Sequence, residues 1–486
     1  MNQASNTVRF VLDGAIIEAA GERHSTSVLD YLREHLHRTG TKEGCAEGDC
    51  GACVVLVGEL NTSGTAVDYV PVNSCLQLLP TLDGKSVKTV ESLQRADGAL
   101  HPVQQAMADS HGTQCGFCTP GIVMSLTGLV QTVAKPTRSE INDALSGNLC
   151  RCTGYKPIID ATLAACEAPA DRLKLDDSRD LPLLRQLRRE SGEQQPLRSA
   201  EGGEFFAPTT LTALADYLAR HPDATLLAGS TEIGLQVNKQ FARPGRIAYL
   251  GQVSELRRIE DRGAFWRIGA QVSLTQVQAL VADAYPDFAE VLRRFGSPPI
   301  RSTATLAGNI ANGSPIGDSM PCLLALGAVL LLRRAEVRRT LALDQFYTGQ
   351  KKNALQSGEL IEAVDLPKPA PGQVFRAHKV SKRFDQDISA TCCAMSYQLL
   401  DGKFAGVRLA YNGLAPSPCR APALEAVING RAPEAVSAAE LDQAIAGSFT
   451  ARDGLRASWT YRSLLARNLV LQFAEEAMTP TMEIAQ

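Results

Sequence analysis

The sequence concentrates its reactive side chains in TKEGCAEGDCGACVVLV, residues 41–57, where three cysteines fall within nine residues. Grouped cysteines serve as disulfides, zinc ligands, redox-active thiols or iron-sulfur ligands. The N-terminal residues MNQASNTVRFVLDG lack the basic region and apolar core of a secretory signal, so we expect a cytoplasmic protein. A reducing compartment disfavours structural disulfides, which leaves metal ligation or catalysis as the favoured role.

The first cysteine group has four members: Cys45, Cys50, Cys53 and Cys75. Its spacing, Cys-x4-Cys-x2-Cys with a distant fourth cysteine, is typical of the 2Fe-2S cluster of plant-type ferredoxins. An anionic cluster needs backbone N–H donors at close range. Three glycines of the loop allow that approach because they lack a Cβ atom: Gly44, Gly48 and Gly51. Zinc sites usually use paired Cys-x2-Cys knuckles, so zinc fits this group poorly.

The second group also has four members: Cys115, Cys118, Cys150 and Cys152. Thr119 and Pro120 predict the N-cap and first residue of a helix that follows Cys118. Thr137 and Glu140 predict a capping box for a second helix, and residues 156–167 a third. Helix N-termini stabilise anions, so a cluster is again favoured, although spacing alone leaves a four-cysteine zinc site open. The other five cysteines, Cys166, Cys322, Cys392, Cys393 and Cys419, we interpret as ordinary thiols.

The elements around the first group predict a small α+β module. Alternating apolar residues before Asp13-Gly14, and more beyond it, indicate a β-hairpin. Ser27 and Asp30 begin a predicted helix, and residues 54–57 read as a buried strand after the cysteine loop. Hairpin, helix, loop and strand together are typical of a ferredoxin-like fold.

Beyond the cysteine groups, residues 169–204 are rich in charge and predict an interdomain connector. Residues 225–234 and 265–274 look strand-like. Two glycine-marked loops, residues 227–233 and 305–318, could bind phosphate through backbone N–H groups, although such loops are more often plain turns. Neither loop is a G-x-G-x-x-G motif, and the sequence has no Walker A pattern.

Composition excludes several classes of protein. A length of 486 residues predicts about three domains. A net charge of −3 gives no reason to expect a nucleic-acid or anionic-membrane partner, and the longest apolar run, residues 321–332, is too short to span a bilayer. The seven histidines form no metal-spaced pair, and no Ser-His-Asp arrangement suggests a hydrolase.

The motifs CGFCTPG (115–121) and GNLCRCTGY (147–155), placed after a ferredoxin-type cysteine loop, resemble the iron-sulfur half of the xanthine dehydrogenase and aldehyde oxidase family of molybdenum hydroxylases. The resemblance implies two 2Fe-2S clusters and an α+β multidomain fold. It implies a β-grasp ferredoxin domain at 1–90, a four-helix 2Fe-2S domain at 91–168 and a linker at 169–204. An α+β FAD-binding domain at 205–372 and a C-terminal α+β flavoprotein subdomain at 373–486 would follow.

The same resemblance implies FAD contacts in the second half of the chain. They are Leu226, Leu227, Ala228, Gly229, Ser230, Thr231, Glu232, Ile233, Phe295, Thr305, Gly308, Asn309, Asp318, Ile361 and Lys379. Phe295 would cover the isoalloxazine ring, and Lys379 would lie near its carbonyl edge in a flexible loop. Ser230 replaces an asparagine common in the family, and Ala307 replaces a glycine.

The implied function is electron transfer during hydroxylation of xanthine or hypoxanthine. Electrons would pass from molybdopterin on a separate large subunit through both clusters to FAD and then to NAD+, with no hydroxylation residues on this chain. Because the chain ends soon after the expected flavin domain, we expect the molybdenum centre on a separate polypeptide. The resemblance implies that the two chains form an (αβ)2 heterotetramer. The alternatives are a related aldehyde or N-heterocycle hydroxylase, an oxidase that reduces dioxygen, and a stand-alone iron-sulfur flavoprotein electron carrier or redox sensor.

Overall fold

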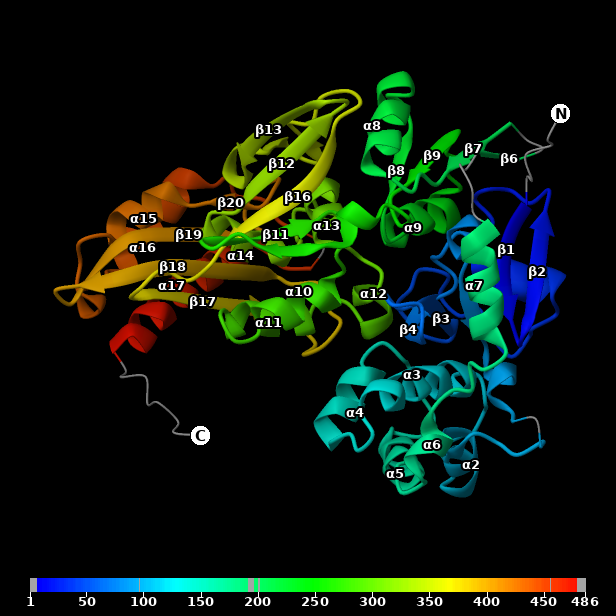
Figure 1. Cartoon of the computed structure of the whole chain (residues 1–486). Coiled ribbons are helices and arrows are strands. Elements are labelled where there is room, and N and C mark those ends of the chain that lie inside the picture. The colour runs from blue at the N-terminus through cyan, green and yellow to red at the C-terminus, as the bar shows by residue number, and fades with distance from the viewer. Residues whose placement is uncertain (1–6, 96, 191–195, 200–201, 455, 479–486) are drawn as a thin grey trace. The chain divides into compact units, whose positions relative to one another are not determined.

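The computed structural model describes residues 7–95, 97–190, 196–199, 202–454 and 456–478 (Figure 1). The chain divides into two compact units. Unit 1 comprises Met1–Leu214, Asp223–Val253 and Ser297–Ala304, and unit 2 comprises Ala215–Pro222, Ser254–Gly296 and Thr305–Gln486.

Unit 1 begins with a five-stranded sheet in the order β2-β1-β5-β3-β4, drawn in blue in Figure 1. Its strands are β1 (Thr7–Leu12), β2 (Ala15–Ala20), β3 (Val54–Leu60), β4 (Val67–Asn73) and β5 (Ser86–Lys88). The predicted hairpin is confirmed, since β1 and β2 pair antiparallel around Asp13 and Gly14, both with positive φ. Strand β5 pairs parallel to β1 and antiparallel to β3, which produces the ferredoxin-like topology.

Strand β3 is buried on both faces, which explains its unbroken apolar sequence. Val55 and Val57 pack in the core under helix α1 (Val28–Asp30), which continues as a π-helix over Tyr31–His35. Val54 and Leu56 belong to a second core, shared with the helical domain. The predicted helix start is confirmed, because the Ser27 side chain accepts a hydrogen bond from the Asp30 N–H.

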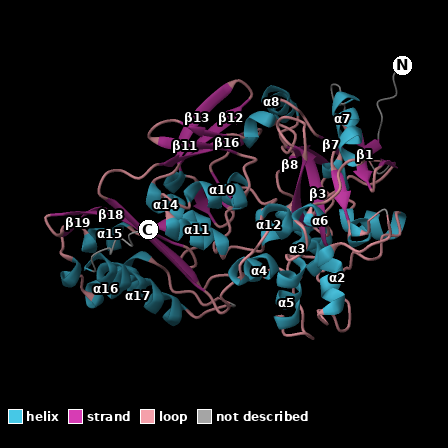
Figure 2. Ribbon diagram, turned by 60° about the horizontal axis from the view of Figure 1, so that its bottom comes forward, coloured by secondary structure: helices cyan, strands magenta, loops and turns pink. Residues whose placement is uncertain are grey.

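The second domain of unit 1 contains four helices, as expected, and no strand among its described residues (Figure 2). They are α2 (Pro102–Asp109), α3 (Thr119–Thr132), α4 (Arg138–Leu145) and α5 (Lys156–Ala165). The capping box of Thr137 and Glu140 is confirmed. The predicted N-cap of α3 is wrong by one residue, since Cys118 occupies that position and Thr119 is the first helical residue.

The charge-rich connector is more structured than its composition suggests. It contains α6 (Ala170–Leu173) and α7 (Asp180–Glu190), and residues 191–195 and 200–201 of it lie outside the described residues. Leu184 and Leu187 of α7 are buried against Val11 of β1. Helix α7 therefore packs on the ferredoxin-like sheet, because two leucines on one face suffice to anchor an otherwise polar helix.

The rest of unit 1 is a four-stranded sheet in the order β6-β7-β9-β8 with short helices. Its elements are β6 (Leu197–Arg198), β7 (Glu204–Phe206), β8 (Thr225–Leu227), α9 (Thr231–Gln240), β9 (Arg246–Tyr249) and α12 (Pro298–Arg301). The strand-like interpretation of residues 225–234 is wrong beyond Leu227. Ser230 has a φ of 65°, which ends the extended backbone, and α9 begins at the next residue.

Unit 2 contains two sheets and a small hairpin. The sheet β10-β11-β16-β12-β13 comprises β10 (Ile259–Asp261), β11 (Phe265–Gly269), β12 (Val329–Arg334), β13 (Val337–Ala342) and β16 (Leu360–Pro367). Its helices are α10 (Leu274–Val281), α11 (Pro286–Arg293), α13 (Leu306–Asn312) and α14 (Ser319–Leu326), and α8 (Leu211–Arg220) has residues in both units. The hairpin pairs β14 (Tyr347–Gly349) with β15 (Lys352–Asn353).

The C-terminal part of unit 2 is a sheet in the order β17-β18-β19-β20 with a core of its own. Its elements are β17 (Gln373–Val380), β18 (Thr391–Leu400), β19 (Lys403–Tyr411), β20 (Cys419–Arg420), α15 (Pro422–Ile428), α16 (Ala438–Ser448) and α17 (Trp459–Met478). Short 3-10 turns occur at Leu79–Leu82, Val90–Leu93, Ser254–Arg257, Leu343–Gln345 and Pro433–Ala435. Among the described residues, no helix has the length and apolar character needed to cross a membrane.

Candidate functional site

The first cysteine group consists of two thiol pairs. The sulfur atoms of Cys53 and Cys75 lie 3.2 Å apart, and both residues are buried. Their hydrogen bond lowers the pKa of Cys53 and raises that of Cys75. In the other pair, a hydrogen bond with Cys50 is the main cause that lowers the pKa of Cys45 to about 5. One thiol of each pair is therefore predisposed to ionise and bind a metal.

The backbone of the loop is shaped around these sulfur atoms. The N–H groups of Glu47 and Asp49 point at Cys45 Sγ, with N···S distances of 3.4 and 3.3 Å. A Cβ atom on Gly44 would lie only 2.7 Å from Cys50 Sγ, so a side chain there would displace the sulfur. The two other loop glycines have φ angles of 78° and 70°, which other residues rarely adopt.

The second group also forms two pairs, Cys118 with Cys150 and Cys115 with Cys152. Cys115 and Cys152 are exposed, in contrast to the buried pair of the first group. Burial, followed by the contact with Cys150, raises the pKa of Cys118 to about 12. Cys118 is the N-cap of α3, so this pair lies at the positive end of a helix.

Tyr155 supports the second group and was not predicted from the sequence. Its φ is 67°, an uncommon conformation for a bulky residue. Its hydroxyl accepts a hydrogen bond from the N–H of Cys150 at 2.8 Å and donates one to the carbonyl of Asn148 at 2.9 Å. Tyr155 therefore fixes the backbone that carries Cys150.

Thiol pairs are what a binuclear cluster requires. Within the part of the chain that the structure describes, no three His, Cys, Asp or Glu side chains converge as a site for one metal ion would require. A 2Fe-2S cluster with four cysteines instead takes two thiolates on each iron. The donor set and the N–H groups directed at sulfur fit two such clusters, whereas a four-cysteine zinc site needs all four thiolates around one point.

The two cysteine loops are bonded to each other inside unit 1. The N–H of Leu149 donates to the carbonyl of Cys50 at 3.0 Å, and the Asn148 amide donates to the carbonyl of Gly51 at 3.2 Å. A Cβ atom on Gly51 would lie 2.3 Å from the carbonyl oxygen of Gly147. The backbone of the ferredoxin-like domain therefore contacts the backbone of the helical domain directly, at the two loops that carry the predicted cluster ligands.

The predicted flavin loop of unit 1, residues 226–233, runs from the end of β8 into the start of α9. Ser230 is the N-cap of α9, but its hydroxyl does not cap the helix and instead donates to the carbonyl of Leu76 at 2.6 Å. The side chain of Ser230 therefore leaves the first N–H groups of α9 to other acceptors, and such groups suit phosphate. A Cβ atom on Gly229 would lie 1.9 Å from the carbonyl oxygen of Thr303, so only glycine fits.

In unit 2 the structure brings two predicted flavin residues together. Asp318 and Lys379 form an ion pair at 2.8 Å, and both side chains are almost completely buried. Asp318 also accepts hydrogen bonds from Ser389 at 2.6 Å and Asn412 at 2.8 Å, and Lys379 donates to the carbonyl of Arg294 at 2.8 Å. Ser389 and Asn412 were missed, because no local pattern connects them to Asp318.

The other predicted residues of unit 2 lie in or beside helices α11 and α13 and strand β16. Thr305 caps α13 by accepting from the N–H of Gly308 at 3.0 Å, and the Asn309 side chain accepts from Ser319 at 2.6 Å. Ile361 is buried in β16, and Phe295 follows α11. Among these predicted residues, the structure joins Asp318 with Lys379 by an ion pair and Thr305 with Gly308 by a hydrogen bond.

The segment predicted to be a flexible loop beside the flavin, residues 378–389, is a loop only in part, because its first three residues end strand β17 and Lys379 is one of them. The rest of the segment is held by Arg294. Its guanidinium donates to the carbonyls of Phe384 at 2.9 Å and Lys379 at 3.1 Å, and to the hydroxyl of Ser381 at 3.2 Å. Its charge also lies over the Phe384 ring. Arg294 precedes Phe295 in the sequence, so one residue links the predicted ring-covering phenylalanine to this loop.

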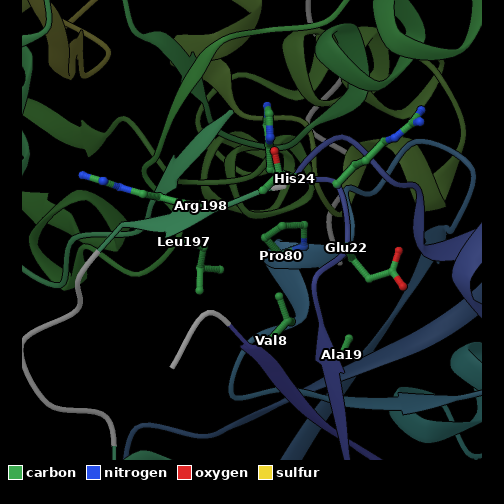
Figure 3. Close-up of a pocket in the computed structure, with 9 residues that line it drawn as sticks. Val8, Ala19, Glu22, His24, Pro80, Leu197 and Arg198 are labelled. Atoms are coloured by element: carbon green, nitrogen blue, oxygen red, sulfur yellow. The ribbon is translucent and has the colours of Figure 1, made fainter. Parts of the chain in front are cut away.

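A small cavity of unit 1 lies apart from all the predicted site residues (Figure 3). It is lined by Val8, Ala19, Glu22, Arg23, His24, Pro80, Leu197, Arg198 and Ser199. His24 Nε2 lies 2.6 Å from the carbonyl of Pro244, while Nδ1 has no hydrogen-bond partner among the described residues. None of the cysteine groups or predicted flavin residues contributes to it.

Four known domain families match the chain in succession. Residues 10–77 match the 2Fe-2S iron-sulfur cluster binding domain, and residues 89–163 match the [2Fe-2S] binding domain. Residues 199–369 match the FAD binding domain in molybdopterin dehydrogenase, and residues 376–477 match the CO dehydrogenase flavoprotein C-terminal domain. The cofactors supported by these matches are two 2Fe-2S clusters and FAD.

Among curated proteins, the chain is 31% identical to xanthine dehydrogenase of Emericella nidulans over 480 residues, which cover 88% of this chain and 35% of that protein. It is 30% identical to xanthine dehydrogenase/oxidase of Gallus gallus, over 84% of this chain and 35% of that protein. The chain thus spans about a third of the length of the curated relatives it matches.

Solved structures show the same fold over a little more than half of the chain. Carbon monoxide dehydrogenase from Hydrogenophaga pseudoflava superimposes with a TM-score of 0.51 and 26% identity, over 57% of this chain and 96% of that chain. Quinoline 2-oxidoreductase from Pseudomonas putida 86 gives a TM-score of 0.51 at 21% identity, over 57% of this chain and 98% of that one, which shows the fold alone.

Proposed function

Because this chain belongs to the iron-sulfur and flavin part of the molybdenum hydroxylase family, we propose that it is the electron-transfer subunit of a xanthine dehydrogenase. Electrons from the hydroxylation of xanthine or hypoxanthine on a separate molybdopterin subunit reach NAD+ through this chain. The two subunits form an (αβ)2 heterotetramer. The curated relatives support this substrate, since those named xanthine dehydrogenase and xanthine dehydrogenase/oxidase align over 88% and 84% of this chain.

The observation that carries the proposal is the arrangement of eight cysteines as four thiol pairs, in a chain whose later residues match a flavin domain. When bound, 2Fe-2S clusters exchange single electrons and FAD exchanges two, so together they connect a substrate oxidation to hydride transfer. The two thiol pairs of the first group would hold one cluster, with Cys53 and Cys75 buried, and the two pairs of the second group would hold the other, with Cys115 and Cys152 exposed. Leu149 and Cys50 connect the two loops through one backbone hydrogen bond.

The residues proposed to contact FAD have two tasks. In unit 1, residues 229–233 offer backbone N–H groups and a glycine without a side chain to the phosphates. In unit 2, Asp318 holds the ammonium of Lys379 at a fixed position, since both groups are buried and paired. A buried, paired cation is suited to bind a ring carbonyl, whereas a solvated lysine would first have to be ordered.

The test is to co-express this chain with its molybdopterin subunit and follow the purified complex after mixing with xanthine under anaerobic conditions. We expect bleaching of the iron-sulfur and flavin absorption, and then reoxidation by NAD+. A Cys75→Ser complex is the matched control, because it should retain flavin but lose the first cluster.

Each other outcome selects an alternative. Bleaching by an aldehyde or an N-heterocycle but not by xanthine would show a related hydroxylase. Reoxidation by dioxygen in preference to NAD+ would show an oxidase. A chain that carries iron and flavin but never copurifies with the molybdopterin subunit would be a stand-alone carrier, and a colourless chain that binds zinc would overturn the whole assignment.

A further inference from the structure

Helix α9 connects the predicted flavin loop to both segments that carry the first cysteine group, entirely within unit 1. The side-chain amide of Asn238, in the third turn of α9, donates to the carbonyl of Cys75 at 2.7 Å and to the carbonyl of Ala46 at 3.0 Å. One acceptor is thus the carbonyl of a predicted cluster ligand, and the other is the carbonyl of the residue that follows Cys45. One side chain thus bridges two segments that lie far apart in the sequence.

Asparagine is suited to this position for two reasons. Its NH2 group has two hydrogens and can donate to two carbonyls at once. Ala46 has a φ of 54°, so its peptide is held in the left-handed region that disfavours a residue with a Cβ atom. The hydrogen bond from Asn238 stabilises this conformation, which sets the direction of the backbone leaving Cys45.

Residues at the start of α9 also contact the segment that follows Cys75. Ser230 donates to the carbonyl of Leu76, and the Gln77 amide donates to the carbonyl of Gly229 at 3.2 Å. A Cβ atom on Gly234 would lie 2.2 Å from the carbonyl oxygen of Leu76, so the helix backbone rests directly on the segment after Cys75. The position of Cys75 is therefore tied to α9 along several turns.

We propose that Asn238 is a positioning residue for the first cluster, which holds the Cys45 loop and the Cys75 segment at a fixed separation from the flavin-domain helix. This inference rests on the proposed function in taking these cysteines as cluster ligands. Asn238 binds neither metal nor flavin itself and acts through the two carbonyls. The second cysteine group has no contact with this side chain among the described residues, so it serves as an internal reference.

The test compares Asn238→Leu, which keeps a similar volume but has no donor, with Gln240→Leu on the exposed end of the same helix. The full chain is reduced with dithionite, and the two clusters are followed by electron paramagnetic resonance, redox titration and iron loss to a chelator. Cys75→Ser identifies which signal belongs to the first cluster. We expect Asn238→Leu to shift the signal and midpoint potential of that cluster and to speed its iron loss about thirtyfold, as expected for two lost hydrogen bonds.

The second cluster should be unchanged in Asn238→Leu, and Gln240→Leu should match the unmodified chain in every measurement. A first cluster that is unaffected, or two clusters affected equally, would overturn the positioning role. If Asn238→Leu does not fold, Asn238→Ser replaces it. Serine retains one short donor, so an intermediate shift supports the role and an unchanged cluster overturns it. Absence of both signals from the unmodified chain would instead overturn the proposed function.

Discussion

Replacement of Gly121 by alanine should destabilise the junction between the two cysteine loops, although alanine is the better helix former. Gly121 lies in the first turn of α3, where alanine would gain at most about 1 kcal/mol from helix propensity. However, its Cβ atom would lie 2.1 Å from the carbonyl oxygen of Gly51, and the next nearest atoms are also backbone. Because backbone cannot rotate away, α3 or the cysteine loop must move.

The expected loss of local stability is the cost of overpacking minus the gain in helix propensity. Overpacking of a buried site costs about 1–3 kcal/mol, and the upper end applies because the obstacle is a backbone carbonyl. After subtraction of the propensity gain, Gly121→Ala should lose about 2 kcal/mol, which corresponds to about a thirtyfold change in a local opening equilibrium. Gly128 is the matched control on the same helix, since the nearest atom to its Cβ position is a leucine methyl at 3.1 Å, which can move.

Amide hydrogen exchange of the full chain, read by mass spectrometry over residues 119–132, measures this local stability directly. A local measurement is preferable, because a chain with two compact units need not unfold in one step. We expect exchange in this segment to accelerate in Gly121→Ala and to stay constant or slow in Gly128→Ala. Equal or greater protection in Gly121→Ala would refute the argument that backbone contact between the two loops determines the residue at this position.

Three further predictions concern one proposed cluster ligand of unit 1 and two ion pairs of unit 2. Cys75→Ser should lose about two of about four iron atoms per chain while the flavin content stays constant, as metal and flavin analysis would show. Lys379→Met should cost about 3–5 kcal/mol by leaving Asp318 buried without its cation, and Asp318→Asn in the same chain should recover part of the lost melting temperature. Burial opposes ionisation of Glu359, but its ion pair with Arg339 at 2.7 Å leaves its pKa below the ordinary 4.5. That ion pair should therefore stabilise the fold above pH 4.5, and its contribution should be lost as the pH falls through the lowered pKa. In Glu359→Gln, the melting temperature measured at a series of pH values should therefore fall less steeply toward acid pH.

Local patterns predicted the elements that depend on nearby residues. The β1–β2 hairpin follows from alternation around Asp13-Gly14, and the capping box of Thr137 follows from a residue three positions away. The unbroken apolar run of β3 indicated burial, but only the structure shows that its two faces belong to different cores. Short-range signals thus identify an element more reliably than they identify what it packs against.

Contacts between distant segments could not be predicted in the same way. Asn238 looks like an ordinary polar residue of a helix, and its two acceptors lie more than a hundred residues earlier in the chain. Asn412 follows β19 and Ser389 precedes β18, and the pairing of these strands brings both side chains to Asp318, which lies far earlier in the sequence. The cysteine spacing predicted two groups of four, but the pairing of Cys53 with Cys75 depends on how β3 and β4 pair.

The order of burial along unit 1 gives the proposed electron route a direction. The second cysteine group reaches the surface through Cys115 and Cys152, where a donor protein can approach. Its loop is bonded to that of the first group between Leu149 and Cys50, and the first group is bonded through Leu76 to Ser230 in the predicted flavin loop. A cluster held by the first group would lie between the second group and the predicted flavin loop, and its buried ligands Cys53 and Cys75 would shield it from solvent more than the exposed Cys115 and Cys152 shield the other cluster. The sequence of contacts therefore favours entry at the second cluster and exit at the flavin.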